Sequence, residues 1–243
     1  MKLILFDVDG ALVPNGGKIQ EDMIECLNKI REMGITLGIV GGGEYDKISD
    51  QLDGNEGYFS YIFTDLGAVL HVDGKRIVDK NMLDHCDRDM LNSIIRVAMV
   101  SICSMPILYH GGQVNVRKGS IYVTPSGVQA TSYEKEMFME IDKRLGLIDR
   151  LVMDIKSVAG FTENFDIVMG ELGCTFYLKG WDKTSVLNSI PDHFDDIYFL
   201  GDRTYVNGID YSLYSHERVK GHSVANYQDC ISKIETILSM END

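Results

Sequence analysis

Short apolar runs alternate with helix-length amphipathic segments in the first part of the chain. The run 3–6 is apolar and lies between polar residues, and the run 35–40 is mostly apolar and lies between glycines; both are typical of strands buried on both faces. Residues 20–34 carry apolar side chains at helical spacing and end at a glycine, as many helices do. A second helix is predicted over about 44–53 and a further strand over 61–64. This alternation predicts a parallel sheet with crossover helices.

The pattern changes after this point. Residues 69–72 are predicted to form the first arm of a hairpin that turns at Asp73-Gly74, and an apolar pattern of helical length follows over about 81–104. The short β-rich runs "ILYH", "QVNVR" and "SIYVT" come next, and glycines separate them, which favours an antiparallel meander. A helix is then predicted from "SYEKEMFMEIDKRLGL", with Ser132 as its N-cap.

The first pattern returns near residue 183. A helix over about 183–190, a buried strand over 196–202, a short strand at "SVAN" and a last amphipathic helix from about 227 complete it. We therefore predict an α/β protein with two domains. They are a Rossmann-like core with a parallel sheet, residues 1–80 and 183–243, and an inserted α+β cap with an antiparallel sheet, residues 81–182.

Composition narrows the range of partners. The chain has 243 residues and a formal net charge of -14, from 37 acidic and 23 basic residues. Nucleic acid and anionic membranes are not expected partners, because phosphate groups require a basic surface. No apolar run approaches the length of a membrane span. The five cysteines are scattered without CxxC spacing, which favours free thiols and a cytosolic location.

Three short motifs carry candidate chemistry. "DVDG" follows the first strand, "GDRT" follows the strand over 196–202, and "GWDK" lies where the chain re-enters the core. The carboxyl ends of parallel strands meet at one edge of a sheet, where open α/β folds bind their ligands. Asp7, Asp9 and Asp202 would supply carboxylates there for Mg²⁺, a hard cation that prefers oxygen ligands.

The same motifs suit phosphoryl transfer. Asp7 is a candidate nucleophile that would form an acyl phosphate, and Asp9 could act as general acid and base. Lys183 would compensate the negative charge of nucleophile and phosphate. Each motif alone has a plainer explanation, since a DxDG is more often a turn and a lone lysine says little. Their joint placement at strand ends and at the domain junction favours the catalytic interpretation.

The segments "LFDVDGAL", "GIVGGGEYDKI", "GWDK" and "IYFLGDRTYVNGID" resemble the haloacid dehalogenase superfamily of phosphotransferases and, more narrowly, the eukaryotic-type phosphomannomutases. The resemblance continues through "VNVRKGSIYVTPSG" and covers essentially the whole chain. It implies a haloacid-dehalogenase-type fold and an Mg²⁺-dependent enzyme with Asp7 as nucleophile and Asp9 as acid/base. Such enzymes interconvert mannose 6-phosphate and mannose 1-phosphate, with a sugar 1,6-bisphosphate as activator. They are typically cytoplasmic homodimers joined through the cap, and they supply GDP-mannose for protein glycosylation.

Several core positions depart from the family pattern. The resemblance places the loop Gly42–Gly43 at the transferred phosphate, but Gly43 stands where the family has a serine or threonine. Ala11 replaces a usual threonine, Ile209 replaces an asparagine near the metal, and His216 replaces an aspartate of a second cation loop. The carboxylates and the lysine of the three motifs are all retained.

The cap departs further. The resemblance implies that arginines of the cap grip the distal phosphate of the sugar, and only Arg117 keeps its place. Val128 and Lys135 stand at two other arginine positions, while Gly173 and Thr175 stand at positions that contact the sugar. Each lost charge-assisted hydrogen bond would cost roughly 1.5–3 kcal/mol. Arg117, Lys135 and Thr175 are the candidates that are left for binding substrate in the cap.

Three hypotheses follow from this pattern. The first, which we favour because the resemblance spans the cap, is a phosphomannomutase with a divergent substrate pocket that acts on a small sugar phosphate. The second is an Mg²⁺-dependent phosphatase of a small phosphorylated metabolite, which needs no strong distal phosphate site. The third is a catalytically weak homologue that serves as a binding partner. The retained acidic residues argue against the third.

Overall fold

The computed structural model describes residues 1–240. The chain forms two compact units: the core, from Met1 to Lys80 and again from Gly180 onward, and the cap, Asn81–Lys179. The return to the core lies at Gly180, ahead of the predicted Lys183. Within this added stretch, the Asp182 carboxylate accepts the backbone N–H of Thr184 at 2.8 Å and caps the next core helix.

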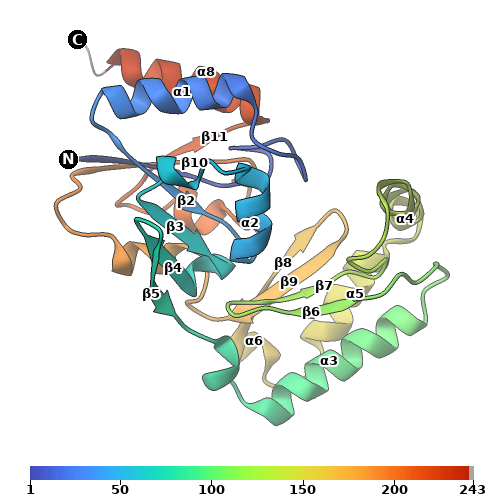
Figure 1. Ribbon diagram of the computed structural model, residues 1–243. Helices are drawn as coiled ribbons and strands as arrows, with labels where there is room; N and C mark the ends of the chain where they lie inside the picture. Colours follow the sequence, from blue (N-terminus) through green and yellow to red (C-terminus); the bar gives the residue numbers. More distant parts are fainter. Residues whose placement is uncertain (241–243) are drawn as a thin grey trace. The chain divides into compact units, whose positions relative to one another are not determined.

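The core is built around one seven-stranded sheet in the order β11-β10-β1-β2-β3-β4-β5 (Figure 1). The strands from β11 to β3 are parallel, and β4 and β5 complete the sheet as an antiparallel hairpin. The strands are β1 Lys2–Phe6, β2 Thr36–Val40, β3 Tyr61–Thr64, β4 Val69–Val72, β5 Lys75–Asp79, β10 Asp196–Gly201 and β11 Lys220–Ser223.

Helices cover the core sheet because the side chains of its buried strands alternate between two faces. Ile4 and Phe6 of β1 pack with α1 and α8, which lie side by side (Figure 1). Leu3 and Leu5 pack on the opposite face with the short helix η4. The helices of the core are α1 Glu21–Glu32, α2 Tyr45–Leu52, η1 Glu56–Tyr58, η2 Asp65–Gly67, η4 Lys183–Ser189, α7 Tyr211–Tyr214 and α8 Tyr227–Met240.

The register of the parallel strands brings the ends of β1 and β10 together. Phe6 pairs with Leu200, and the backbone N–H of Asp7 donates to the carbonyl oxygen of Leu200 at 2.9 Å. Phe6 also pairs with Ile39 of β2. The residues that follow these strands therefore share one edge of the core sheet, as the sequence pattern predicts.

The cap contains an antiparallel sheet in the order β6-β7-β9-β8. Helix α5 packs on β8 and β9, and α3 runs along α5. The ring centroids of Phe161, Phe165 and Phe176 lie 5.6–5.9 Å from one another, and these contacts pack α6 against this sheet. The elements of the cap are η3 Met82–Asp84, α3 Arg88–Cys103, β6 Val114–Val116, β7 Ile121–Val123, α4 Ser132–Leu145, α5 Leu147–Lys156, α6 Phe161–Asn164, β8 Phe165–Gly170 and β9 Gly173–Leu178.

The predicted meander in the cap is only partly correct. The run "ILYH" forms no strand; it lies beside the end of α3, where the Tyr109 hydroxyl donates to the carbonyl oxygens of Ile102 and Met105. Of the three predicted runs, the second and third form β6 and β7, which pair as a hairpin. Strands β8 and β9, which the pattern did not reveal, form a second hairpin and complete the sheet.

Several helix and strand boundaries also differ from the prediction. Helix α3 begins at Arg88, since the Asp87 carboxylate caps it, and Thr131, not Ser132, is the N-cap of α4 through a capping box. Gly146 adopts φ 61° and separates α4 from α5. The last strand ends where "SVAN" begins, at Ser223. Within residues 1–240, no helix is both long and apolar enough to cross a membrane.

Candidate active site

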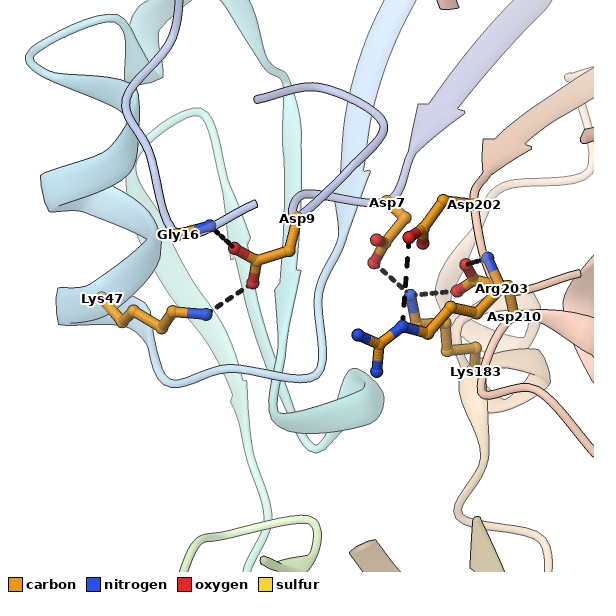
Figure 2. Close-up of polar contacts among 8 residues, drawn as sticks. All are labelled: Asp7, Asp9, Gly16, Lys47, Lys183, Asp202, Arg203 and Asp210. Carbon is orange, nitrogen blue, oxygen red and sulfur yellow. Dashed lines mark hydrogen bonds and ion pairs between the residues drawn. The ribbon is translucent and has the colours of Figure 1, made fainter. Parts of the chain in front are cut away.

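A buried lysine lies at the carboxyl edge of the core sheet. Lys183 begins η4, and its side chain is only 1% exposed. Its ammonium donates to Asp7 Oδ1 and, at 2.5 Å, to Asp210 Oδ1 (Figure 2). Burying an ammonium is costly unless opposite charges surround it, and these two carboxylates keep the pKa of Lys183 above its usual value despite the burial.

Asp202 lies next to this group, directly after β10. Gly10 allows its close approach, because a Cβ on Gly10 would lie 2.6 Å from Asp202 Oδ2. Arg203 Nε lies 3.9 Å from the same oxygen (Figure 2). The other oxygen, Asp202 Oδ1, is buried and has no hydrogen-bond partner within residues 1–240. A buried carboxylate oxygen of this kind calls for a cation.

Asp7, Asp202 and Asp210 form one acidic group, in which one carboxylate oxygen from each residue lies within 4.8 Å of the other two. Burial, together with the charge of Asp210, raises the pKa of Asp7 to about 7 and that of Asp202 to about 6. Three carboxylates so close together repel one another, and a divalent cation would relieve the repulsion. Their hard oxygen donors and the unpartnered oxygen of Asp202 fit Mg²⁺.

Asp210 was not among the predicted site residues. Its Oδ2 accepts the backbone N–H of Arg203 at 3.0 Å, and a Cβ on Gly201 would lie 2.7 Å from that oxygen. The turn that follows β10 therefore folds back so that Asp210 reaches Lys183. One signal could have revealed it, since a lysine expected near Asp7 in a buried site needs more than one counter-charge.

The predicted metal ligand Asp9 lies apart from the acidic group. Its Oδ2 accepts a hydrogen bond from Lys47 Nζ at 2.5 Å (Figure 2). Its Oδ1 accepts hydrogen bonds from Gln51 Nε2 at 2.7 Å and from the Gly16 backbone N–H at 3.1 Å. Burial alone would raise the pKa of Asp9, but the Lys47 charge and these hydrogen bonds lower it overall. Asp210, and not Asp9, is thus the third carboxylate of the cluster.

The loop Gly42–Gly43 lies at the same edge, between β2 and α2. Backbone hydrogen bonds fix it, because Gly43 O accepts Asp65 N at 2.9 Å and Gly41 O accepts Leu66 N at 3.1 Å. A Cβ on Gly43 would lie 3.2 Å from Lys47 Cδ, so the lysine stem lies over the space that a side chain would occupy.

The three cap candidates are not all on one element. Tyr122 of β7 pairs with Thr175 of β9, so their side chains share a face of the cap sheet. The Arg117 guanidinium lies over the Tyr122 ring, 5.0 Å from its centroid. Lys135 lies away from the sheet, in the first turn of α4. Val128, at an expected arginine position, is 42% exposed.

Comparison with solved structures defines the class of protein. The fold is similar to that of an IMP-nucleotidase from Plasmodium falciparum, at TM-score 0.63 and 15% identity over 98% of this chain and 68% of the other. It is also similar to a sugar phosphatase of HAD subclass IIB, at TM-score 0.58 and 17% identity over 96% and 91%. The core and inserted cap thus have the haloacid-dehalogenase-type fold of these proteins.

Comparison with protein families and curated sequences gives a narrower assignment than the fold does. The model of the eukaryotic phosphomannomutase family matches residues 23–240. Curated phosphomannomutases are similar over nearly their whole length: one from Arabidopsis thaliana is 30% identical over 97% of this chain and 96% of its own, and one from Galdieria sulphuraria is 32% identical over 98% and 95%. Human phosphomannomutase 1 is 31% identical over 98% and 93%. The chain belongs to the eukaryotic phosphomannomutase family, and we assign it as an enzyme of that family.

Proposed function

We propose that this protein is an Mg²⁺-dependent phosphomannomutase that interconverts mannose 6-phosphate and mannose 1-phosphate through an aspartyl-phosphate intermediate. The observation that carries the proposal is the buried group of Asp7, Lys183, Asp202 and Asp210 at the carboxyl edge of the core sheet. Family membership supports the substrate.

Each core residue has a role in this reaction. Asp7 attacks phosphorus with a carboxylate oxygen, and the phosphoryl group passes to it as the sugar oxygen leaves. Lys183 holds Asp7 in place, because its ammonium donates to Asp7 Oδ1, and its charge favours the ionised carboxylate against the burial and the charge of Asp210 that raise the Asp7 pKa. Asp9 gives a proton to the leaving oxygen and later removes one from the hydroxyl that accepts the phosphoryl group, which requires it to turn from Lys47 toward the sugar.

Asp7, Asp202 and Asp210 are the side chains that would hold Mg²⁺. Bound there, the ion would compensate the charge of the phosphate. Asp9 remains in the proposal only as acid and base, since its carboxylate is bonded elsewhere.

The wider context of the proposal rests on the family. A sugar 1,6-bisphosphate would prime Asp7, and the product would feed GDP-mannose synthesis for glycosylation. We also propose a cytoplasmic enzyme that forms homodimers through its cap. The free thiols, of which Cys26, Cys174 and Cys230 are buried, agree with a reducing compartment. Exposed apolar side chains on α3 and α5, Val100 and Met153, agree with a cap that is covered by a second copy.

A phosphatase is the second candidate, and the cap favours it. A mutase must bind its bisphosphate intermediate twice in each cycle, once by each phosphate, whereas a phosphatase needs only the core site. The exposed Val128 and the uncharged Thr175 leave the cap with fewer groups for a distal phosphate than the family pattern has.

One assay separates these activities. Purified protein with Mg²⁺ and a catalytic amount of sugar bisphosphate is given mannose 1-phosphate or glucose 1-phosphate, and isomerised product is measured against free phosphate. Isomerised mannose phosphate in excess supports the proposal, while free phosphate alone identifies a phosphatase. Neither product, from protein that is folded and loaded with Mg²⁺, would identify a catalytically weak homologue.

A further inference from the structure

A second lysine at the core site has no assigned role. Lys47 lies on α2, and its side chain is 51% exposed, in contrast to the enclosed Lys183. Its ammonium forms an ion pair with Asp9 at 2.5 Å. An ammonium has three N–H donors, so Lys47 can donate further hydrogen bonds to oxygen atoms of solvent or substrate. Lys183 is less able to donate to a substrate oxygen, because its ammonium already donates to Asp7 and Asp210.

The position of Lys47 is linked to Gly43. A Cβ on Gly43 would lie 3.2 Å from Lys47 Cδ and 4.0 Å from Lys47 Nζ. The missing side chain thus leaves the space through which the lysine stem passes, and its ammonium lies beside the place that a hydroxyl on residue 43 would reach. The loop that carries Gly43 is at the same edge of the sheet as Asp7, since Phe6 and Ile39 pair in the parallel ladder.

Charge gives the reason for a further cation. Four carboxylates, Asp7, Asp9, Asp202 and Asp210, gather at this edge, and a substrate phosphate adds more negative charge. A phosphate therefore needs donors that are positive and close to solvent.

We propose that Lys47 is a phosphate-binding residue, which contacts the transferred phosphoryl group over Gly43 in place of a hydroxyl side chain. The inference rests on the proposed phosphotransferase function and deepens it. When the phosphate binds, Lys47 turns partly from Asp9 toward it, which frees Asp9 Oδ2 for the sugar oxygen, while Gln51 and the Gly16 N–H still donate to Asp9 Oδ1. The ligand class is a phosphate monoester dianion.

The test measures affinity for inorganic phosphate, by calorimetric titration of the Mg²⁺-loaded protein, so that it does not depend on mannose turnover. Lys47→Met keeps the stem and removes the ammonium, and we expect it to weaken phosphate binding at least about tenfold. Lys18→Met is the matched control, because Lys18 is 50% exposed, lies in the core and is paired with Asp53 at 2.6 Å. It should leave the affinity unchanged.

A double substitution distinguishes phosphate binding from a role in holding Asp9. Gly43→Ser restores a hydroxyl, and the backbone of Gly43 permits a side chain because its φ is not positive. In the Lys47→Met background, Gly43→Ser should recover about half or more of the lost binding free energy, whereas Gly43→Ala should recover none. Lys47→Arg should keep most of the affinity. Gln51→Met, which also removes a donor to Asp9, should weaken phosphate binding far less than Lys47→Met.

The inference is overturned if Lys47→Met matches Lys18→Met, or if serine and alanine at position 43 have equal effects in variants that melt like the parent. It is also overturned if Gln51→Met weakens phosphate binding as much as Lys47→Met. A failed mutase assay with an intact Lys47 effect would remove only the mutase assignment. Normal mutase activity without any Lys47 effect would remove only this inference.

Discussion

The core and the cap each contain a predicted phosphate-binding region, and the two hold their charges differently. In the core, Lys183 is enclosed by carboxylates, and Asp9 accepts three hydrogen bonds, so nearly every charge has a fixed partner. In the cap, Arg117 lies over a tyrosine ring and Val128 is exposed. The difference shows where the chain is constrained. Buried charges cannot be exchanged singly without large cost, whereas exposed contacts can be lost one at a time.

The largest expected effect concerns the nucleophile of the core. Asp7→Asn should abolish nearly all phosphoryl transfer, by at least about a thousandfold, because an amide is a poor nucleophile and removes a metal-ligand charge. The variant is nearly isosteric and should stay folded. Transfer to mannose phosphate and hydrolysis of a generic phosphate ester are measured together, and substantial turnover of either would exclude Asp7 as the nucleophile.

The second prediction tests the acidic cluster. Exhaustive chelation with EDTA should reduce activity by about a hundredfold or more, and added Mg²⁺ should restore it, because Asp7, Asp202 and Asp210 would otherwise repel the phosphate. Asp202→Asn should raise the Mg²⁺ concentration that is needed for half-maximal activity. Full activity in EDTA, with metal content checked by elemental analysis, contradicts the proposed mechanism.

More of the strands and site residues could be predicted from the sequence in the core than in the cap, for a physical reason. Buried parallel strands appear in the sequence as apolar runs. Carboxylates directly after such runs, such as Asp7 and Asp202, indicate a functional site, because burying a carboxylate has a high free-energy cost. The position of Asp210 and the pairing of Lys47 with Asp9 depend instead on how the loops fold in three dimensions. No local sequence pattern predicts these contacts. In the cap, the sequence pattern did not predict β8 and β9, because these strands include glycines and lack a clear alternation of apolar and polar residues.

The third prediction tests the cap directly. Val128→Arg with Lys135→Arg should raise the ratio of isomerised product to free phosphate about tenfold, if about 1.4 kcal/mol of distal phosphate binding is regained. Arg117→Ala should lower the same ratio and leave hydrolysis of a small phosphate ester largely unchanged. If the double variant leaves the ratio unaltered and Arg117→Ala reduces both activities equally, these cap residues do not bind the distal phosphate.

The smallest expected effect is on stability, and it arises from the strain of the core cluster. Burial and the charge of Asp210 raise the pKa of Asp7 from 3.8 to about 7. The folded protein therefore holds this proton more tightly than the unfolded chain, and Asp7 lowers stability as the pH rises from about 4 to about 7. An asparagine carries no such penalty, and Asp210 still compensates the Lys183 ammonium at 2.5 Å.

Asp7→Asn should therefore melt higher than the parent in EDTA at pH 8, by about 3 °C or more, and this difference should shrink toward pH 5. Calorimetric melting of both proteins at the two pH values gives the comparison. Arg117→Ala in the cap serves as the control, because its guanidinium is not part of the acidic cluster and should show no such dependence on pH. An equal difference between Asp7→Asn and the parent at both pH values would mean that Asp7 is ionised throughout, and that Lys183 outweighs the burial and the repulsion in the cluster.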